Sequence, residues 1–156
     1  MDKIPLTKPG FQKLDAELKK LKSKDRPAVI RAIAEAREHG DLSENAEYHA
    51  AREQQSHIEG RIKELEGIIG LADVIDISRM SGPVKFGATV TIVDCDTDAE
   101  KTYQLVGEAE ADIEHGLLNI KSPIARALIG KEEGDVAEVK TPGGTKDYEI
   151  LSIKYI

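Results

Sequence analysis

Two long helical patterns joined by a short polar segment most constrain what this chain can fold into. Before the segment, Phe11, Leu14, Leu18 and Leu21 recur at spacings of three and four, which is typical of the narrow apolar seam of a coiled coil. A second stripe follows the segment and runs to about Gly70. Two such helices joined by a few residues must lie antiparallel, so the sequence predicts a helical hairpin with arms of roughly 25–30 residues, about 40–45 Å long. The second stripe comprises Tyr48, Ala51, Gln55, Ile58, Ile62, Leu65 and Ile69.

The first of these helices is expected to have an irregular lead-in and one interruption. Residues 1–10 contain two prolines and a glycine and should be an irregular lead-in, and Thr7 followed by Pro9 indicates where the helix starts. Pro27 lacks a backbone donor and crowds the preceding turn, so we expect a kink or a brief break at residues 24–27. The seam then resumes with Ile30, Ile33 and several alanines.

The C-terminal half changes its pattern after residues 77–82, which we interpret as a linker. Apolar residues there recur with a period of two, and turn residues separate the runs. This pattern predicts a small antiparallel β-sheet with one short helix that begins after Ser122, a good N-cap. The fold class is therefore α+β, with a helical hairpin at 1–76 and a sheet domain at 83–156. The expected strands are 88–93, 101–106, 117–120, 136–139 and 148–156.

Composition limits the classes of partner. The net charge is −7, of which residues 1–76 contribute −2 and residues 77–156 contribute −5, so the free protein should not hold duplex nucleic acid through its phosphates. Aromatic residues make up 4% and Trp is absent, which argues against an aromatic-lined ligand pocket. A single cysteine, Cys95, suits a reducing cytosol. With no leader-like or membrane-spanning apolar run, we expect a cytoplasmic protein without a membrane partner.

The polar segment between the helices, REHGDLSENAEY at residues 37–48, carries two acidic side chains at its centre. Gly40 ends the first helix and the second begins near Asn45. Asp41 and Glu44 fit a capping box for the second helix, which general statistics favour. They also fit ligands of Mg²⁺, which is held by one or two carboxylates together with water and phosphate. A lone turn cannot complete that shell, so the second interpretation requires a partner that supplies more ligands.

The sequence gives less support for other metal-binding or catalytic sites. A self-contained site built from His39 and His49 with the two acids lacks an i,i+4 histidine pair. The acidic turn at 94–100 looks like a calcium loop, but Ala99 stands where glycine is needed and Leu105 stands where glutamate is needed. No nucleophile or phosphate-loop motif is present, so the sequence offers no intrinsic catalysis.

Two arginines flank the acidic turn, one on each arm. Arg37 and Arg52 could be solvated or paired with Glu38, Glu47 or Glu53. They could instead contact a nucleic-acid strand that ends near the turn, as a weak and local attraction through its phosphates.

Several stretches of the sequence are specific when they are taken together. They are Ile4–Thr7 (IPLT), 32–51 (AIAEAREHGDLSENAEYHAA), 52–55 (REQQ), 122–132 (SPIARALIGKE) and 141–144 (TPGG). Over its full length, the chain resembles the Gre family of bacterial transcript cleavage factors. The resemblance implies an N-terminal antiparallel coiled coil and a C-terminal domain with a fold like that of FKBP prolyl isomerases. This domain lacks the aromatic pocket that isomerases need, so we expect no isomerase activity.

The resemblance also implies a function and site residues. In the family, the globular domain docks near the mouth of the RNA polymerase secondary channel and the coiled coil enters it. The tip acids, here Asp41 and Glu44, help the polymerase hold its second Mg²⁺, and Ser43 has a supporting role. Arg37 and Arg52 match the basic patch that contacts the extruded RNA. The polymerase then cleaves the 3′ end of backtracked RNA, which rescues the arrested complex.

On this resemblance the protein has no complete active site and no cofactor of its own, and we expect a monomer. The family is associated with DNA binding, which the acidic charge of this chain does little to support. Two other functions stay open. A channel-blocking inhibitor with the same fold would carry a more acidic tip than Asp41 to Glu44 provides, and a stand-alone metallohydrolase would need a complete ligand set of its own.

Overall fold

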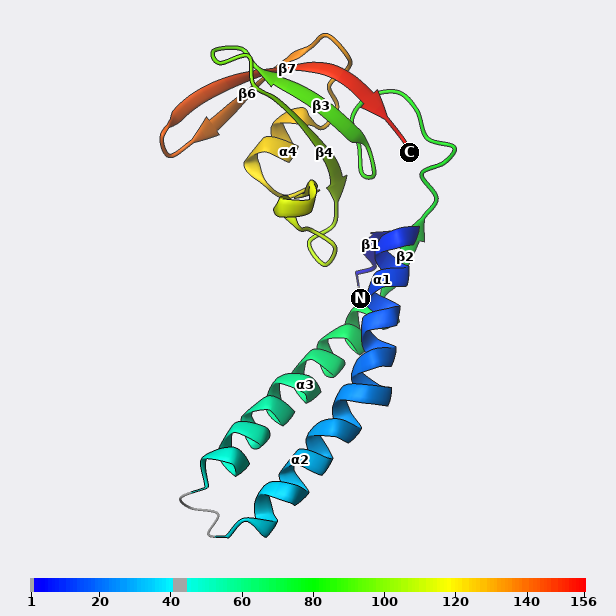
Figure 1. The fold of residues 1–156 in the computed structure, drawn as a ribbon. Coiled ribbons are helices and arrows are strands. Elements are labelled where there is room, and N and C mark those ends of the chain that lie inside the picture. Colours follow the sequence, from blue (N-terminus) through cyan, green and yellow to red (C-terminus); the bar gives the residue numbers. More distant parts are fainter. Residues whose placement is uncertain (1, 41–44) are drawn as a thin grey trace. The chain divides into compact units, whose positions relative to one another are not determined.

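The computed structural model describes residues 2–40 and 45–156 (Figure 1). They form two compact units. The first comprises Phe11–Ala72, and the second comprises Asp2–Gly10 together with Asp73–Ile156. The N-terminal segment therefore belongs to the same unit as the C-terminal sheet.

The first unit is the helical hairpin that the sequence predicts. Its outgoing arm consists of α1 (Lys8–Lys20), a π-helical segment (Leu21–Asp25) and α2 (Arg26–Glu38). Its returning arm is α3 (Ala46–Gly70), which packs along α2 (Figure 1). The first arm ends as expected, because Gly40 has φ +121°, a conformation that L-residues with a side chain rarely adopt.

A narrow seam of apolar side chains holds the two arms together. Val29, Ile58 and Ile62 are buried in one cluster, with Leu18 and Leu21 packed against it. Small residues let the helices approach closely toward the turn, where Ala36 and Ala51 are both buried. The stripe predicted for the second helix is confirmed, because every one of its positions is buried or half-buried.

The inward stripe of α2 differs from the prediction at one position. Ile33 is buried as expected, but Val29 is 2% exposed, whereas Ile30, which was expected in the seam, is 51% exposed. The π-helical segment Leu21–Asp25 takes up one extra residue, so the inward position falls eight residues after Leu21, at Val29.

The kink or brief break expected at 24–27 is confirmed in part. The α-helix is interrupted by the π-helical segment Leu21–Asp25, the chain stays helical through it, and Pro27 falls in the first turn of α2.

Ion pairs along the rim of the seam fix which residues of the two arms face each other. Arg61 of α3 donates two hydrogen bonds to Glu17 of α1, at 2.6 Å from Nε and 2.9 Å from Nη2. Arg26 makes the same kind of double contact with Glu59, at 2.9 and 2.7 Å. The Arg61 guanidinium holds the pKa of the Glu17 carboxyl below its ordinary value. Such two-bond pairs are geometrically specific, so together with the apolar seam they fix how the two arms are aligned along their length.

The second unit contains a five-stranded sheet in the order β5-β4-β3-β7-β6. The short helix α4 (Pro123–Leu128) begins after Ser122, whose hydroxyl accepts a hydrogen bond from the amide of Ala125, as predicted. A 3₁₀ helix, Ile113–His115, precedes β5. The strands are β3 (Thr89–Asp94), β4 (Glu100–Val106), β5 (Leu117–Asn119), β6 (Val136–Thr141) and β7 (Gly144–Lys154).

The predicted α+β class is confirmed, with one difference in the sheet. β5 pairs parallel to β4, with Leu105 opposite Leu118, so the sheet is mixed instead of fully antiparallel. The connection at 107–116 is long enough to carry the chain back before β5 begins, which a tight hairpin could not do. The core of this unit joins residues of all five strands of the sheet to two residues of α4. Its buried members are Val84, Ala88, Val90, Ile92, Leu105, Leu118, Ala125, Leu128, Ala137 and Ile150.

The first residues of the chain are more ordered than the sequence suggests. The irregular lead-in expected at 1–10 is wrong, because Ile4–Thr7 forms the strand β1. β1 pairs with β2 (Ala72–Ile75) in a separate two-stranded sheet. Leu6 and Thr7 are buried, at 0% and 1% exposed, so this strand is an integral part of its unit.

Candidate functional site

The structure describes only part of the predicted site. Asp41, Ser43 and Glu44 lie outside the described residues. Arg37 and Arg52 are described, and both are exposed. Arg37 lies in the last turn of α2 and Arg52 lies in the second turn of α3, so the site can be built from the two helix ends that border residues 41–44.

Asn45 caps the returning helix. It has the extended backbone of an N-cap, and its side-chain oxygen accepts a hydrogen bond from the amide of Tyr48 at 3.0 Å. Its Nδ2 donates to the carbonyl of Ala36 at 2.6 Å, so the same side chain joins the two arms. The N-cap of α3 is therefore Asn45 and not Asp41, while the predicted capping contacts of Asp41 and Glu44 themselves lie outside the described residues.

Tyr48 brings the two predicted arginines together. Their guanidinium carbons lie 5.8 Å (Arg37) and 5.9 Å (Arg52) from the centroid of its ring. Nη1 of Arg52 also donates to the Tyr48 hydroxyl at 3.3 Å. The two positive charges, that of Arg37 foremost, lower the pKa of the Tyr48 phenol because they favour its anionic form. We refer to Arg37, Tyr48 and Arg52 as the arginine–tyrosine cluster.

The arginine–tyrosine cluster places two cations beside the turn. Within the part of the chain that the structure describes, neither arginine forms an ion pair with a carboxylate, and two of the three glutamates that were expected as partners lie near histidines instead. Glu47 lies 3.0 Å from His39, and Glu53 lies 4.0 Å from His57. Planar guanidinium groups bind phosphate through paired donors and stack on aromatic rings. The cluster can therefore contact a phosphodiester strand.

Sequence reasoning missed Asn45 and Tyr48 as members of this region. Tyr48 was assigned only to the apolar stripe, although it is half-buried and ends that stripe at its polar end. The signal was an aromatic ring spaced four residues from Arg52, which places both on one face of a helix. For Asn45, the signal was its place directly before the helical pattern, where Asn is among the best N-caps.

Elsewhere the described residues offer little that resembles a catalytic centre. They contain no group of three or more His, Cys, Asp or Glu side chains placed to hold a metal ion. In the acidic turn after β3, the carboxylate of Asp94 accepts hydrogen bonds from the amides of Asp96 and Thr97, so this side chain stabilises the turn itself. In the same part of the chain, no helix is both long and apolar enough to span a bilayer.

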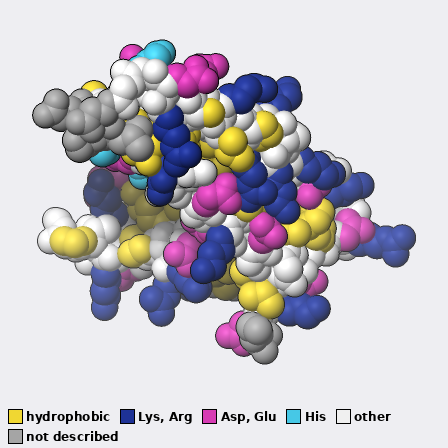
Figure 2. All heavy atoms as spheres, turned by 90° about the horizontal axis from the view of Figure 1, so that it is seen from below, with side chains coloured by type: hydrophobic (Ala, Val, Ile, Leu, Met, Phe, Trp, Pro, Cys, Tyr) yellow, Lys and Arg dark blue, Asp and Glu magenta, His cyan; other side chains and the backbone are white. Residues whose placement is uncertain are grey.

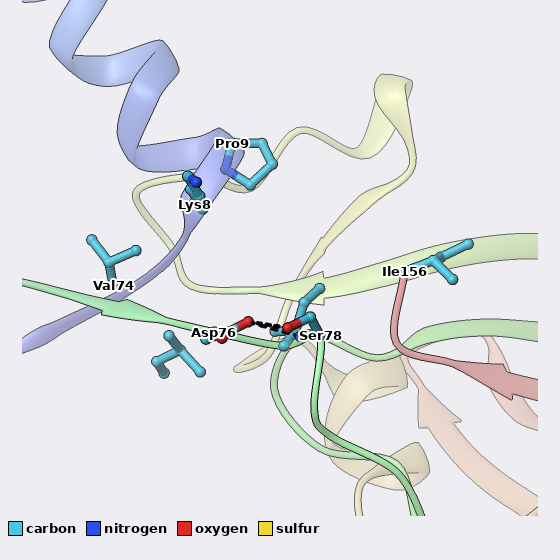
Figure 3. A pocket seen from close by; sticks show the side chains of 8 residues that line it. Lys8, Pro9, Val74, Asp76, Ser78 and Ile156 are labelled. Atoms are coloured by element: carbon cyan, nitrogen blue, oxygen red, sulfur yellow. Dashed lines mark hydrogen bonds between the residues drawn. The ribbon is translucent and has the colours of Figure 1, made fainter.

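The second unit has a pocket of about 530 Å³. Figure 3 shows Lys8 and Pro9 on one side of it, with Asp76 and Ser78 opposite. The Asp76 carboxylate accepts hydrogen bonds from the amide and hydroxyl of Ser78, at 3.0 and 2.6 Å. The other lining residues are aliphatic, and the described Asp76–Ser78 contact lacks the third group that would orient a catalytic base. They are Val74, Ile75, Ile77 and Ile156.

Charge on the surface is mixed. On the face shown in Figure 2, Lys and Arg side chains are interspersed with Asp and Glu side chains, and the chain as a whole carries −7. A continuous basic surface of the kind that binds duplex DNA is not seen on this face. The arginine–tyrosine cluster is therefore a local feature.

Comparison with known proteins identifies the family. Two sequence models match, "Transcription elongation factor, N-terminal" at residues 4–74 and "Transcription elongation factor, GreA/GreB, C-term" at residues 79–155. Proteins named transcription elongation factor GreA are 75% identical in Ruegeria pomeroyi, over 99% of both chains, and 72% identical in Cereibacter sphaeroides, over the full length of both. The chain belongs to the GreA/GreB family of transcription elongation factors.

Solved structures of related factors also match. GreA factor homolog 1 of Thermus thermophilus superposes with a TM-score of 0.46 at 25% identity, over 97% of this chain and 99% of that chain. A GreA/GreB elongation factor from Nitrosomonas europaea gives a TM-score of 0.42 at 21% identity, over 98% of this chain and the full length of that chain.

Proposed function

We propose that this elongation factor stimulates RNA polymerase to cleave the 3′ end of backtracked RNA, and that it does so by inserting its hairpin into the secondary channel of the polymerase. The observation that carries the proposal is the arginine–tyrosine cluster, which pairs Arg37 and Arg52 beside the turn that contains Asp41 and Glu44. Cations for an RNA strand and carboxylates for a metal ion are the two components that such a tip needs.

The hairpin suits a probe that enters a channel. α3 has 25 residues, which gives a length of about 38 Å at 1.5 Å per residue. Its apolar stripe is already buried against the first arm, so the outer surface of the hairpin is mostly polar, with Ile30 as an exposed exception. A mostly polar rod with a closed seam can enter a wet channel while exposing little apolar surface.

Asp41 and Glu44 are the residues that would hold Mg²⁺ jointly with the polymerase. Two carboxylates are a typical protein contribution to a magnesium site, and the remaining ligands come from water, phosphate or a partner. The bound ion would stabilise charge during phosphodiester hydrolysis. Asn45 supports this assignment, because it caps α3 and leaves the acids free of that role. Ser43 is assigned a supporting role beside them.

Arg37 and Arg52 would hold the extruded RNA by its phosphates, and Tyr48 would keep the two guanidinium groups together. The reaction itself belongs to the polymerase, so the factor has no complete active site of its own. The second unit is proposed to dock on the polymerase as a monomer in the cytoplasm. Its net charge of −5 over residues 77–156 favours a basic surface on the partner and disfavours direct DNA binding.

A halted, backtracked elongation complex with end-labelled RNA tests the proposal. The expected result is prompt release of short 3′ fragments, followed by resumed elongation when nucleotides are added. Slower synthesis without cleavage would instead make the protein a channel-blocking inhibitor. Cleavage of the same RNA without polymerase would make it a nuclease in its own right, and polymerase alone provides the background rate.

A further inference from the structure

The side chain of Asn45 serves both helices that border the turn. α2 ends and α3 begins with backbone groups that no residue of the same helix can satisfy. The carbonyl of Ala36, in the last turn of α2, accepts a hydrogen bond from Nδ2 of Asn45 at 2.6 Å. The amide of Tyr48, in the first turn of α3, donates to Oδ1 of Asn45 at 3.0 Å. One side-chain amide therefore closes the C-terminal end of one arm and the N-terminal end of the other.

Few side chains can make this pair of hydrogen bonds. Asn and Gln are the residues whose side-chain amide offers both an N–H donor and a carbonyl acceptor, and of the two only Asn is a good N-cap. Ser or Thr would cap α3 as well, but the short hydroxyl would not reach the Ala36 carbonyl while it accepts from the Tyr48 amide. The bond across to α2 is therefore what distinguishes Asn at position 45 from other capping residues.

Two other contacts join the same two helix ends, and both involve exposed charges. Nδ1 of His39 lies 3.0 Å from Oε2 of Glu47, and these side chains are 62% and 70% exposed. The arginine–tyrosine cluster supplies the other contact, through an exposed guanidinium of α2. Exposed charge pairs contribute little stability, whereas the bond from Asn45 is partly buried and Ala36 is 3% exposed. Asn45 therefore provides the firmest of these three links between the arms.

We propose that Asn45 is a positioning residue, which holds the ends of α2 and α3 at a fixed separation and thereby fixes the frame that carries Asp41 and Glu44. The inference rests on the proposed function, because it concerns the delivery of these two carboxylates to one metal ion. Residues 40–44 alone connect His39, the C-cap of α2, to Asn45. A connection this short has few conformations once its two end points are fixed, so Asn45 acts on the acids through the two helix ends.

Loss of the bond between Asn45 and Ala36 would act on the cleavage rate through geometry. Mg²⁺ demands near-ideal placement of its ligands, so two carboxylates serve one ion only when both reach it in the right positions. Misplacement of a contributing group by about 1 Å can lower a reaction rate about a hundredfold even when the chemistry is unchanged. A tip whose helix ends can move apart should therefore stimulate cleavage more slowly, while the affinity of the factor for polymerase stays the same.

Amide hydrogen exchange in the full chain tests the link without polymerase. Asn45→Ser keeps an N-cap for α3 but loses the bond to Ala36, so its effect should appear on the other arm. The His39 amide, which donates to the Ala36 carbonyl at 3.2 Å, should exchange about threefold faster as the last turn of α2 loosens. The Tyr48 amide should keep its protection in Asn45→Ser and lose it in Asn45→Ala. Unchanged exchange of His39 in Asn45→Ser would overturn the link.

Thermal unfolding and cleavage assays over a range of factor concentrations separate positioning from capping. Asn45→Ala should lower the midpoint of thermal unfolding by about 3 °C, because a helix cap is lost, and Asn45→Ser should lower it by less. Both variants should nevertheless lower the cleavage rate at saturation about tenfold and leave the half-saturating concentration unchanged, whereas a merely destabilised protein would shift that concentration. A wild-type saturating rate in Asn45→Ser would overturn the positioning role, because the cap alone would then suffice.

Glu47→Gln is the matched control, because it removes the exposed pair with His39 and keeps the shape of the side chain. Its saturating rate should stay within about twofold of wild type. A tenfold loss would show that any change beside the turn impairs cleavage, and would overturn the specific role of Asn45. If wild type itself stimulated no cleavage while His39 exchange still depended on Asn45, the proposed function and the positioning role would fail together, and the link between the two arms would stand.

Discussion

The hairpin unit and the sheet unit of this chain are stabilised in different ways. The hairpin has a narrow seam, in which Val29, Ile58 and Ile62 form one buried cluster, and two-bond ion pairs such as Arg61–Glu17 line its rim. The sheet unit has a cluster of ten buried residues in one core shared by five strands and α4. Within the described residues, neither unit leaves a buried polar side-chain atom without a partner.

The difference indicates a division of work between the units. The hairpin has a thin seam and no large core of its own. Each helical turn is therefore held mainly by the turn that faces it on the other arm. The sheet unit supplies long-range contacts and a firm base instead. Loss of a tip residue should therefore change function and spare stability, whereas loss of a core residue should do the opposite.

The largest effect is expected at the tip. Asp41→Asn or Glu44→Gln should lower stimulated cleavage about a thousandfold, because the metal loses a charged ligand worth several kcal/mol in the transition state. The measurement is 3′ fragment release from a backtracked complex, with thermal unfolding and polymerase binding as controls. Cleavage retained in both variants would refute the assignment of the tip acids, and a fall in stability would remove the contrast between the units.

A large stability effect is expected in the sheet core. Leu128→Ala should lower the free energy of unfolding by about 3 kcal/mol, and Ile62→Ala in the seam by about 2 kcal/mol, because the seam can close around a cavity more easily. Urea unfolding followed by helical circular dichroism and by tyrosine fluorescence would separate the two units. The same loss in one shared transition would contradict independent stabilisation.

A smaller and more selective effect is expected at the arginine–tyrosine cluster. Arg52→Ala should lower cleavage about tenfold when the extruded RNA is long and change it little when the RNA is short, because only a long strand reaches the arginines. Arg52→Lys is the control, since it keeps the charge but loses the planar stacking group. An equal loss on all transcripts would point to a folding defect in the arm.

The smallest effect is expected at the rim of the seam. Glu17→Gln should cost roughly 0.5 kcal/mol at neutral pH, as for other partly exposed ion pairs. Because Arg61 lowers the pKa of Glu17 from its ordinary value of 4.5, the pair stabilises the fold above about pH 4.5 and less so as the pH falls through the lowered value. The free energies of unfolding of wild type and Glu17→Gln should therefore converge at acid pH. A difference that stays constant with pH would show that loss of this ion pair is not the cause of the destabilisation.

The apolar pattern of the sequence predicted the hairpin well. It failed where the prediction depended on which of two neighbouring residues faces the other arm. Val29 and Ile30 are adjacent, and either could continue the seam. With the extra residue of the π-helical segment, Val29 is the position that follows Leu21 in the seam, and an extra residue in a helix leaves no clear sign in the apolar pattern. Asp41 and Asn45 present the same problem, because both are good N-caps. The cross-arm bond from Asn45 to Ala36 favours the later helix start.

Contacts between distant residues could not be predicted from the sequence. The bond between Thr7 and Glu110 spans 103 positions, and neither residue type identifies its partner. The parallel pairing of β5 likewise depends on how residues 107–116 turn. The arginine–tyrosine cluster was predicted in part, since the flanking arginines were noted but the ring that unites them was not.

The π-helical segment has a consequence for the reach of the hairpin. Leu21 and Val29 both face the seam although they are eight positions apart, while two ordinary helical turns of a coiled coil need seven. Removal of one residue from the segment would turn it into regular α-helix and keep both side chains inward, at a cost in length of about 1.5 Å. This arm can thus lose one residue without rotating its inward face, whereas the insertion of one more residue would turn the part of the arm beyond it away from α3.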